Sequence, residues 1–254
     1  MRKFFIEEKL PSNLNEEFII DGTEAHHISN VLRLKVGSDI IVTSKKQISQ
    51  AVKAEITQLE NGQVALKSKE FLDDDTEPPI DIFLVQSICK SDKMDYIIQK
   101  SVELGVSGII PVFSEHCTVK YDASKRNSRV ERWQKISIEA SKQCGRFFVV
   151  PIMPIIDLKD FLSEDFLNQY SFSEKILLYE GQASIGLKDA IQGSNSSSYV
   201  LFIGSEGGYS DKEVELFKEN GVKIVTLGPR ILRAETASLA VISAIMYEHG
   251  DLGG

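Results

Sequence analysis

The stretch YVLFIGSEGGYSDKEVELF, residues 199–217, decides the fold class of this chain. Its first residues are apolar and typical of a buried strand, which ends at a glycine turn over residues 204–208. Ser210 and Glu213 then have the spacing of a helix capping box. A strand, a glycine turn and a helix start in this order indicate an α/β fold with a ligand-binding turn. Such turns usually hold phosphate on backbone N–H groups, yet this one carries a carboxylate, Glu206.

The composition describes a globular chain that can bury a substantial core. Its 254 residues, 42% of them hydrophobic, suit one large domain or two unequal ones. No apolar run approaches the roughly 18 residues of a membrane span, and the opening MRKFFIEEKL has acids where a signal peptide has an apolar segment. We therefore expect a cytoplasmic protein with no membrane partner.

The cysteines and histidines predict neither a disulfide framework nor a metal site. Cys89, Cys117 and Cys144 form no CxxC pair and are odd in number. His26 and His27 are adjacent, so on a helix their side chains point in different directions, and we interpret them as packing or capping residues. We expect reduced, mostly buried cysteines and no bound metal.

Charge is distributed unevenly along the chain. The net charge of −8 argues against a nucleic-acid partner, because phosphate binding needs local cations. Residues 118–146 nevertheless hold eight basic and three acidic residues, a local balance of +5. This segment is either a solvated helix face or a phosphate-binding surface, and its composition leaves both open.

A domain boundary is predicted in EFLDDDTEPP, residues 70–79, whose acids and Pro-Pro pair suit an exposed linker. Residues 1–72 contain short alternating runs typical of antiparallel strands, with Asn61-Gly62 as a hairpin turn. One helix interrupts them over residues 23–33, with Thr23 as its N-cap. We predict a small β-barrel with a helix and with strands at residues 40–44, 50–56 and 63–68.

Residues 73–254 alternate between strand and helix patterns. This alternation predicts a mainly parallel sheet covered by helices on both faces. Ligands on such sheets gather at the carboxyl ends of the strands. The expected strands are residues 80–88, 108–113, 175–180, 200–204 and 222–228, and the expected helices are residues 92–104, 129–143 and 233–248 besides the one opened by Ser210.

The turns do not match nucleotide-phosphate motifs, because neither GxGxxG nor GxxxxGK[ST] occurs in the chain. Glu206 would repel a polyphosphate, but it could accept hydrogen bonds from an amine or hydroxyl and would tolerate a positively charged ligand. S-adenosyl-L-methionine, with its α-amino group, ribose hydroxyls and sulfonium, fits this description. The alternative is that the glycines only form a tight turn and that Glu206 faces water.

The stretch LGPRILRAETASLAVISAI, residues 227–245, is the most unusual part of the chain. Arg230, Arg233 and Glu235 lie beside a glycine turn and are followed by a helix that is apolar on almost every side. Such a helix must be buried, so we expect it to contact the core on one side and a second subunit, in a homodimer, on the other. Arg233 and Glu235 could instead form only a structural ion pair.

Five motifs spread along the chain are HHISNVLRL (residues 26–34), IIQKSVELGV (97–106), KQCGR (142–146), IGSEGG (203–208) and LGPRILRAETA (227–237). In this order they resemble the bacterial 16S ribosomal RNA (uracil-N3)-methyltransferases of the SPOUT superfamily, and the resemblance includes the closing GDLGG. The chain departs from the family at Ser205, where proline is usual, and at Lys142, where an acid is common. Serine removes a fixed φ angle and adds a hydrogen-bond donor.

The resemblance implies an amino-terminal PUA-like barrel that binds RNA and a carboxyl-terminal SPOUT-type α/β domain with a deep trefoil knot. It also implies that loops of the knot hold S-adenosyl-L-methionine and that a homodimer completes the active site. The residues it assigns to the cofactor are Leu178, Tyr179, Glu180, Ile203, Gly204, Ser205, Glu206, Gly207, Gly208, Leu227, Gly228, Arg230, Ile231, Leu232, Glu235, Thr236 and Ala237.

The implied reaction is methylation of N3 of a specific uridine in the 16S ribosomal RNA of the small ribosomal subunit. N3 lies on the Watson–Crick edge, so the base must be unpaired, and a negative ring develops as the N3 proton leaves. We expect Arg233 to stabilise this charge, with Arg230 in reserve, while Glu235 either orients Arg233 or acts as the base. The candidate RNA contacts are Arg2, Arg33, Lys120, Arg126, Arg129 and Arg146.

Two other classes of function stay open from the sequence. A non-catalytic RNA-binding ribosome-assembly factor would keep the barrel and the basic segment but would not need Arg233 and Glu235. A nucleotide-using α/β enzyme would need a phosphate cradle, which the motifs do not supply.

Overall fold

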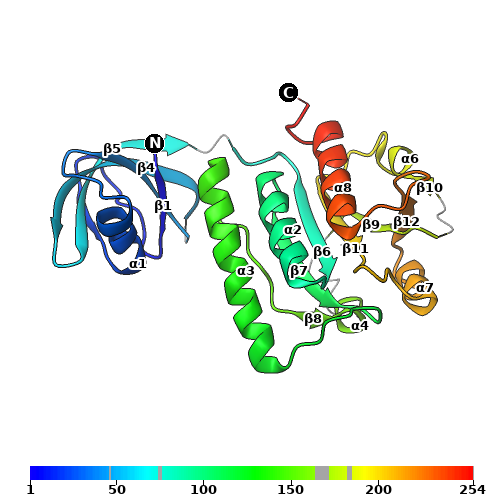
Figure 1. Cartoon of the computed structure of the whole chain (residues 1–254). Helices are drawn as coiled ribbons and strands as arrows, with labels where there is room; N and C mark the ends of the chain where they lie inside the picture. The colour runs from blue at the N-terminus through cyan, green and yellow to red at the C-terminus, as the bar shows by residue number, and fades with distance from the viewer. Residues whose placement is uncertain (46, 74–75, 164–171, 182–184, 254) are drawn as a thin grey trace. The chain divides into compact units, whose positions relative to one another are not determined.

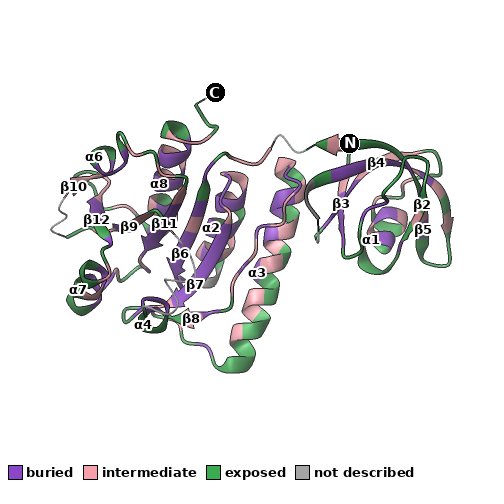
Figure 2. Ribbon diagram, turned by 180° about the vertical axis from the view of Figure 1, so that it is seen from behind, coloured by how far each residue is buried: buried purple, intermediate pink, exposed green. Residues whose placement is uncertain are grey.

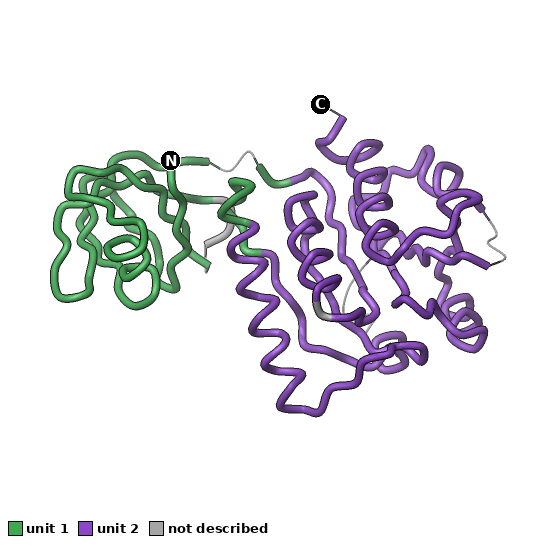
Figure 3. The backbone as a smooth tube through the Cα atoms, in the orientation of Figure 1, with its two compact units in different colours: residues 1–77, 141–149 green, residues 78–140, 150–254 purple. Residues whose placement is uncertain are grey.

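The computed structural model describes residues 1–253 except 46, 74–75, 164–171 and 182–184. The chain divides into two compact units, one formed by residues 1–77 and 141–149 and the other by residues 78–140 and 150 to the C-terminus (Figure 3). Each unit contains its own cluster of buried apolar side chains.

The strands of the first unit, blue to cyan in Figure 1, form a five-stranded sheet. Their order is β1-β3-β4-β5-β2. β1 runs parallel to β3, whereas the other neighbouring strands are antiparallel, as predicted. The hairpin between β4 and β5 turns at Asn61 and Gly62, whose φ angles of 52° and 77° suit the predicted Asn-Gly turn. The strands are β1 Lys3–Ile6, β2 Glu17–Ile20, β3 Asp39–Ser44, β4 Gln47–Glu60 and β5 Gln63–Asp73.

Two predictions for this unit are wrong in detail. β5 extends to Asp73, so residues 70–73 of the predicted linker are strand and pair with β4. The predicted helix is instead a short α-helix, α1 Gly22–His26, followed by a π-helical turn, η1 His27–Val31. Its N-cap is Asp21 rather than Thr23, since the helix starts at Gly22 with a φ of 61°, a value that favours glycine.

The second unit is built on a seven-stranded sheet with the order β10-β12-β9-β11-β6-β7-β8. All neighbouring strands in it are parallel, which confirms the predicted α/β class. The central strands β6 and β11 are buried over most of their length, as Figure 2 shows in purple, which is typical of a parallel sheet covered on both faces. The strands are β6 Asp81–Ser87, β7 Gly108–Phe113, β8 Ile156–Asp157, β9 Glu174–Leu178, β10 Ile185–Gly186, β11 Ser198–Ile203 and β12 Lys223–Thr226.

Three of the four helices predicted for this unit begin and end close to the predicted residues, whereas α3 begins at Ala123 and not at residue 129, and the short helices α4 and α6 were not predicted. Ser210 caps α7: its hydroxyl accepts from the Glu213 N–H at 3.3 Å, and the Glu213 carboxylate accepts from the Ser210 N–H at 2.9 Å. Among the described residues, no helix combines the length and the apolar character needed to span a bilayer. The helices are α2 Ser91–Glu103, α3 Ala123–Cys144, α4 Leu158–Phe161, α6 Leu187–Ile191, α7 Asp211–Glu219 and α8 Ala234–Glu248.

The last helix, α8, is buried on one side only within this chain. Val241 and Ile242 are fully buried and α8 packs on α2. Leu239 and Ala240 are half-buried, and Tyr247 is 68% exposed. The apolar residues of α8 therefore have a face that the described part of the chain leaves uncovered.

Candidate active site

A pocket opens at the carboxyl ends of three neighbouring strands, β12, β9 and β11, where a parallel sheet is expected to bind its ligand. It is lined by residues 178–180, 203–205, 208–209 and 226–232, with Ala234 and Ala237. The three turns that follow β9, β11 and β12 in the sequence therefore meet at one place.

Most residues that the sequence assigned to the cofactor line this pocket. The exceptions are Glu206, Gly207, Glu235 and Thr236, which lie outside its lining. Four lining residues were not among the residues assigned to the cofactor. Pro229 and Ala234 lie within the stretch LGPRILRAETA itself, and Tyr209 and Thr226 directly adjoin the predicted turns, which is the signal that could have found them.

The turn after β11 needs glycine because its backbone packs closely. A Cβ on Gly204 would lie 3.1 Å from the Gly208 Cα, and a Cβ on Gly207 would lie 2.8 Å from the His116 Cβ. The Gly208 N–H also donates to the Ser205 carbonyl at 2.9 Å, which closes the turn. The glycines thus allow the main chain to approach both the pocket and a neighbouring loop.

That neighbouring loop, residues 114–117, follows β7 and holds the turn by hydrogen bonds. The buried Ser205 hydroxyl donates to the His116 carbonyl at 3.2 Å, and the His116 Nδ1 lies 2.9 Å from the Gly207 carbonyl oxygen. The Ser210 hydroxyl donates to the Glu115 carboxylate at 2.7 Å, which lowers the Glu115 pKa. The pocket turn is therefore fixed from outside the pocket.

Two buried polar side chains also stabilise this turn, through contacts between β6 and the residues at the end of β11. The Gln86 amide, fully buried on β6, lies 3.4 Å from the Ile203 carbonyl oxygen and 3.3 Å from that of Gly204. The Tyr209 hydroxyl lies 3.2 Å from the Ser87 hydroxyl, and burial raises the Tyr209 pKa far above its ordinary value. Both side chains bind as neutral groups and stabilise the end of β11.

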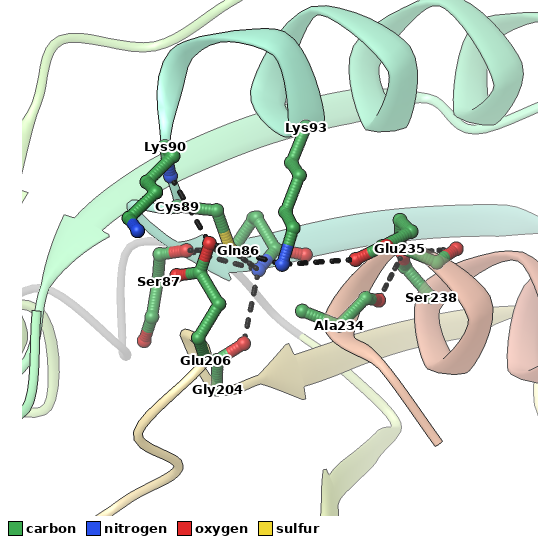
Figure 4. Close-up of polar contacts among 10 residues, drawn as sticks. All are labelled: Gln86, Ser87, Cys89, Lys90, Lys93, Gly204, Glu206, Ala234, Glu235 and Ser238. Carbon is green, nitrogen blue, oxygen red and sulfur yellow. Dashed lines mark hydrogen bonds and ion pairs between the residues drawn. The ribbon is translucent and has the colours of Figure 1, made fainter.

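Glu206 faces helix α2 rather than the pocket (Figure 4). Its Oε1 lies 3.1 Å from the Lys93 Nζ and accepts from the Lys90 backbone N–H at 3.4 Å. Burial opposes ionisation, but the backbone N–H of Glu206 itself, together with Lys93 and Lys90, outweighs it and lowers the Glu206 pKa. The carboxylate that does line the pocket is that of Glu180.

A second groove lies between α2 and α8 and contains two of the predicted residues that lie outside the pocket. Glu235 and Thr236 line it together with Lys93, Tyr96 and Leu239. Glu235 pairs with Lys93, with 3.7 Å between Oε2 and Nζ. The alternative that the sequence left open, a structural Arg233–Glu235 ion pair, is not formed, and across the described residues the exposed Arg233 side chain has no hydrogen-bond or ion-pair partner.

The predicted RNA-contact residues fall into three groups. Arg2, Arg33 and Lys120 are exposed. Arg126 and Arg129 are half-buried, with their guanidinium groups 4.7 Å above the Phe113 ring and 5.5 Å above the Tyr121 ring. Arg146 is only 3% exposed and pairs with Glu77 inside the first unit, so its position is that of a structural residue. No cluster of three potential metal ligands occurs within the described residues.

Comparison with known proteins identifies the family. A family model for an RNA methyltransferase domain matches residues 76–246, and one for an RNA methyltransferase PUA domain matches residues 20–67. The chain is 35% identical to the ribosomal RNA small subunit methyltransferase E of Bacillus subtilis (strain 168), over 98% of this chain and 97% of that protein. It is 28% identical to the protein of the same name from Buchnera aphidicola subsp. Acyrthosiphon pisum (strain APS), over 98% of this chain and 94% of that one.

Solved structures agree with this assignment. The ribosomal RNA small subunit methyltransferase E of Neisseria gonorrhoeae, bound to S-adenosyl methionine, is 35% identical and has a TM-score of 0.88, with 99% of each chain covered. A putative methyltransferase from Legionella pneumophila, in complex with the cofactor SAM, is 28% identical with a TM-score of 0.86, over 98% of each chain. This chain therefore belongs to the ribosomal RNA small subunit methyltransferase E family, with an N-terminal PUA domain and an α/β RNA methyltransferase domain.

Proposed function

We propose that this chain transfers a methyl group from S-adenosyl-L-methionine to N3 of a uridine in the 16S ribosomal RNA of the small ribosomal subunit. The observation that carries the proposal is the pocket at the ends of β9, β11 and β12, because its lining comes from the three turns that the sequence resemblance assigns to the cofactor. Family members solved with S-adenosylmethionine support this choice of cofactor.

The pocket residues fit this cofactor chemically. Gly204 and Gly208 present main chain without side chains, so the edge of a flat adenine can reach backbone amides. Leu227 and Ile203 offer apolar contact to its faces, and the Glu180 carboxylate can accept hydrogen bonds from an amino group or ribose hydroxyls. When bound, the cofactor supplies an electrophilic methyl group on a positively charged sulfur.

Three residues of the stretch after β12, Arg230, Arg233 and Glu235, carry out the rest of the chemistry in this proposal. Arg233 stands between the pocket residues Leu232 and Ala234, and its exposed guanidinium can stabilise the negative charge on the uracil carbonyl oxygens as the proton leaves N3. Arg230, in the pocket lining, is the reserve. Glu235 pairs with Lys93 and not with Arg233, so it does not orient Arg233, and we assign it the other predicted role, that of the base for the N3 proton.

The direct test is nucleoside mass spectrometry of 16S ribosomal RNA from cells that lack the protein. Loss of 3-methyluridine, restored by the wild-type gene, is the expected result, and retention of the modification would reject the proposal. With purified protein, Arg233→Ala should lower turnover by roughly 100-fold or more and leave the cofactor Kd nearly unchanged, because Arg233 lies outside the pocket lining. Lys218→Ala, which removes an exposed ion pair on α7, is the control.

The RNA-binding surface is proposed to use the exposed Arg2, Arg33 and Lys120, together with Arg126 and Arg129. Arg146 is left out because its guanidinium is buried against Glu77. Phosphate contacts release counterions, so RNA affinity should fall steeply as the salt concentration rises. Lys120→Ala should reduce the slope of log affinity against log salt concentration by about one. A flat salt response would contradict this surface.

The remaining proposals concern the domains, the cellular location and the oligomeric state of the chain. We propose an RNA-binding domain and a knotted methyltransferase domain, predicted as residues 1–72 and 73–254. The family matches at residues 20–67 and 76–246 support a boundary in this region, although β5 continues to Asp73 and residues 73–77 and 141–149 belong to the first compact unit. A cytoplasmic homodimer is proposed, with the half-buried Leu239 and the exposed Tyr96 and Tyr247 at the subunit contact. Sedimentation equilibrium tests the dimer, and a monomer at micromolar concentration would argue against it.

A further inference from the structure

Lys93, in the first turn of α2, reaches between two carboxylates that come from different loops. Its Nζ lies 3.1 Å from Oε1 of Glu206, in the turn after β11, and 3.7 Å from Oε2 of Glu235, in the first turn of α8 (Figure 4). Its side chain is 29% exposed. One ammonium group thus connects the turn that forms the cofactor pocket with the helix that carries the proposed base.

The Glu206 contact also stabilises the start of α2. The N-cap residue, Lys90, makes no side-chain capping hydrogen bond, and the Glu206 carboxylate accepts from its backbone N–H instead. A carboxylate at this end of a 13-residue helix also interacts favourably with the helix dipole. Glu206 is therefore held by two groups of α2, which explains why it turns away from the pocket.

The Glu235 contact has a different character. A separation of 3.7 Å from Nζ is an ion-pair distance and is too long for a hydrogen bond. The Glu235 Oε2 is buried and has no hydrogen-bond partner among the described residues. The Lys93 ammonium therefore neutralises a buried carboxylate oxygen that has no hydrogen bond of its own, and this ion pair holds the Glu235 side chain in place.

We propose that Lys93 is a positioning residue for methyl transfer: it fixes Glu235 beside the groove and, through Glu206, the turn that forms one wall of the cofactor pocket. This inference rests on the proposed function. Neither the motifs nor the comparisons assign a role to Lys93. It acts through the two carboxylates and does not itself line the cofactor pocket.

The test compares Lys93→Met, which keeps the length of the side chain and removes its charge, with Lys93→Arg, which keeps the charge. Lys93→Met should lower kcat by roughly 10- to 100-fold, because a displaced catalytic group is costly. Its cofactor Kd should rise by no more than about fivefold, the effect of one partly exposed ion pair. Lys93→Arg should recover most of the lost kcat.

The control is Lys100→Met in the same helix, which removes the Lys100–Glu103 pair at 2.8 Å and should leave kcat unchanged. Thermal melting of each variant separates turnover from folding. Normal kcat in Lys93→Met, or a fall that matches the fraction unfolded and is not recovered by Lys93→Arg, would overturn the inference. If either of these results is obtained while the wild type is active, the inference about Lys93 fails and the proposed function stands. A wild type that neither binds S-adenosylmethionine nor methylates RNA rejects the proposed function itself.

Discussion

The hydroxyl of Ser205 donates to the backbone carbonyl of His116, and this bond joins the pocket turn after β11 to the loop after β7. The resemblance leads one to expect proline at residue 205, which would stiffen the turn by fixing its φ angle. Serine constrains the turn by a different route, because its hydrogen bond anchors the turn to a second loop. His116 adds a contact in the other direction, to the Gly207 carbonyl oxygen.

Ser205→Ala should loosen the cofactor turn. Losing one buried hydrogen bond typically costs about 1 kcal/mol, or roughly fivefold in affinity where the turn must be ordered for binding. Isothermal titration with S-adenosylmethionine measures the effect. Ser163→Ala is the control, because it removes a similar hydroxyl-to-carbonyl bond of 2.7 Å that is exposed and belongs to a residue outside the pocket lining. Equal Kd values for Ser205→Ala and the wild type would contradict the role of this bond.

Gly207→Ala should damage the pocket more severely. The added Cβ would lie 2.8 Å from the His116 Cβ and 3.1 Å from its carbonyl oxygen, so the backbone of one loop must move. We expect a loss of about 1–3 kcal/mol in unfolding free energy and weaker cofactor binding. The control is Gly186→Ala, where the nearest atom to the new Cβ is the Asp189 Oδ2 at 3.8 Å. Urea unfolding of both variants measures how much unfolding free energy each one loses. Equal losses would contradict the steric argument.

Local patterns in the sequence predicted much of the fold and the position of the pocket. The capping box of Ser210 and Glu213 depends on residues three apart, and the glycine turns follow directly after apolar runs. The alternation of strands and helices then predicts a parallel sheet, whose topology brings the ends of β9, β11 and β12 together. These features depend on neighbours in the sequence, which is why they could be predicted.

The direction of individual charged side chains could not be predicted in this way. Glu206 faces Lys93 and not the pocket because α2, over a hundred residues earlier in the chain, supplies an ammonium and a free N–H. Glu235 likewise pairs with Lys93 and not with Arg233, two residues away. Arg146, predicted to contact RNA from a basic run, is buried against Glu77. In each case the deciding partner is distant in sequence.

Cys89 should be chemically inert in the folded protein. Burial and, to a lesser extent, the negative charge of Glu206 raise its pKa to about 12, so almost no thiolate exists at neutral pH. Iodoacetamide at pH 8 should therefore modify the half-buried Cys144 first and reach Cys89 only after denaturation. Peptide mass spectrometry over time measures this order. Cys144→Ser should abolish the fast phase, and modification of native Cys89 at the Cys144 rate would contradict the assignment.

Glu206 should make the stability of the protein depend on pH in the acid range. Its pKa in the folded state lies below that of an unfolded glutamate, so its stabilising contribution is fully present above about pH 4.3 and is lost as the pH falls through the lowered pKa. The wild type should therefore be more stable than Glu206→Gln at pH 7, and this difference in unfolding free energy should shrink on acidification. Glu215→Gln, which removes a mostly exposed pair with Lys218, should show a smaller difference at neutral pH. Urea unfolding at stepwise lower pH measures the unfolding free energy of the wild type and of both variants. A difference between the wild type and Glu206→Gln that stays constant with pH would contradict the ion pair with Lys93.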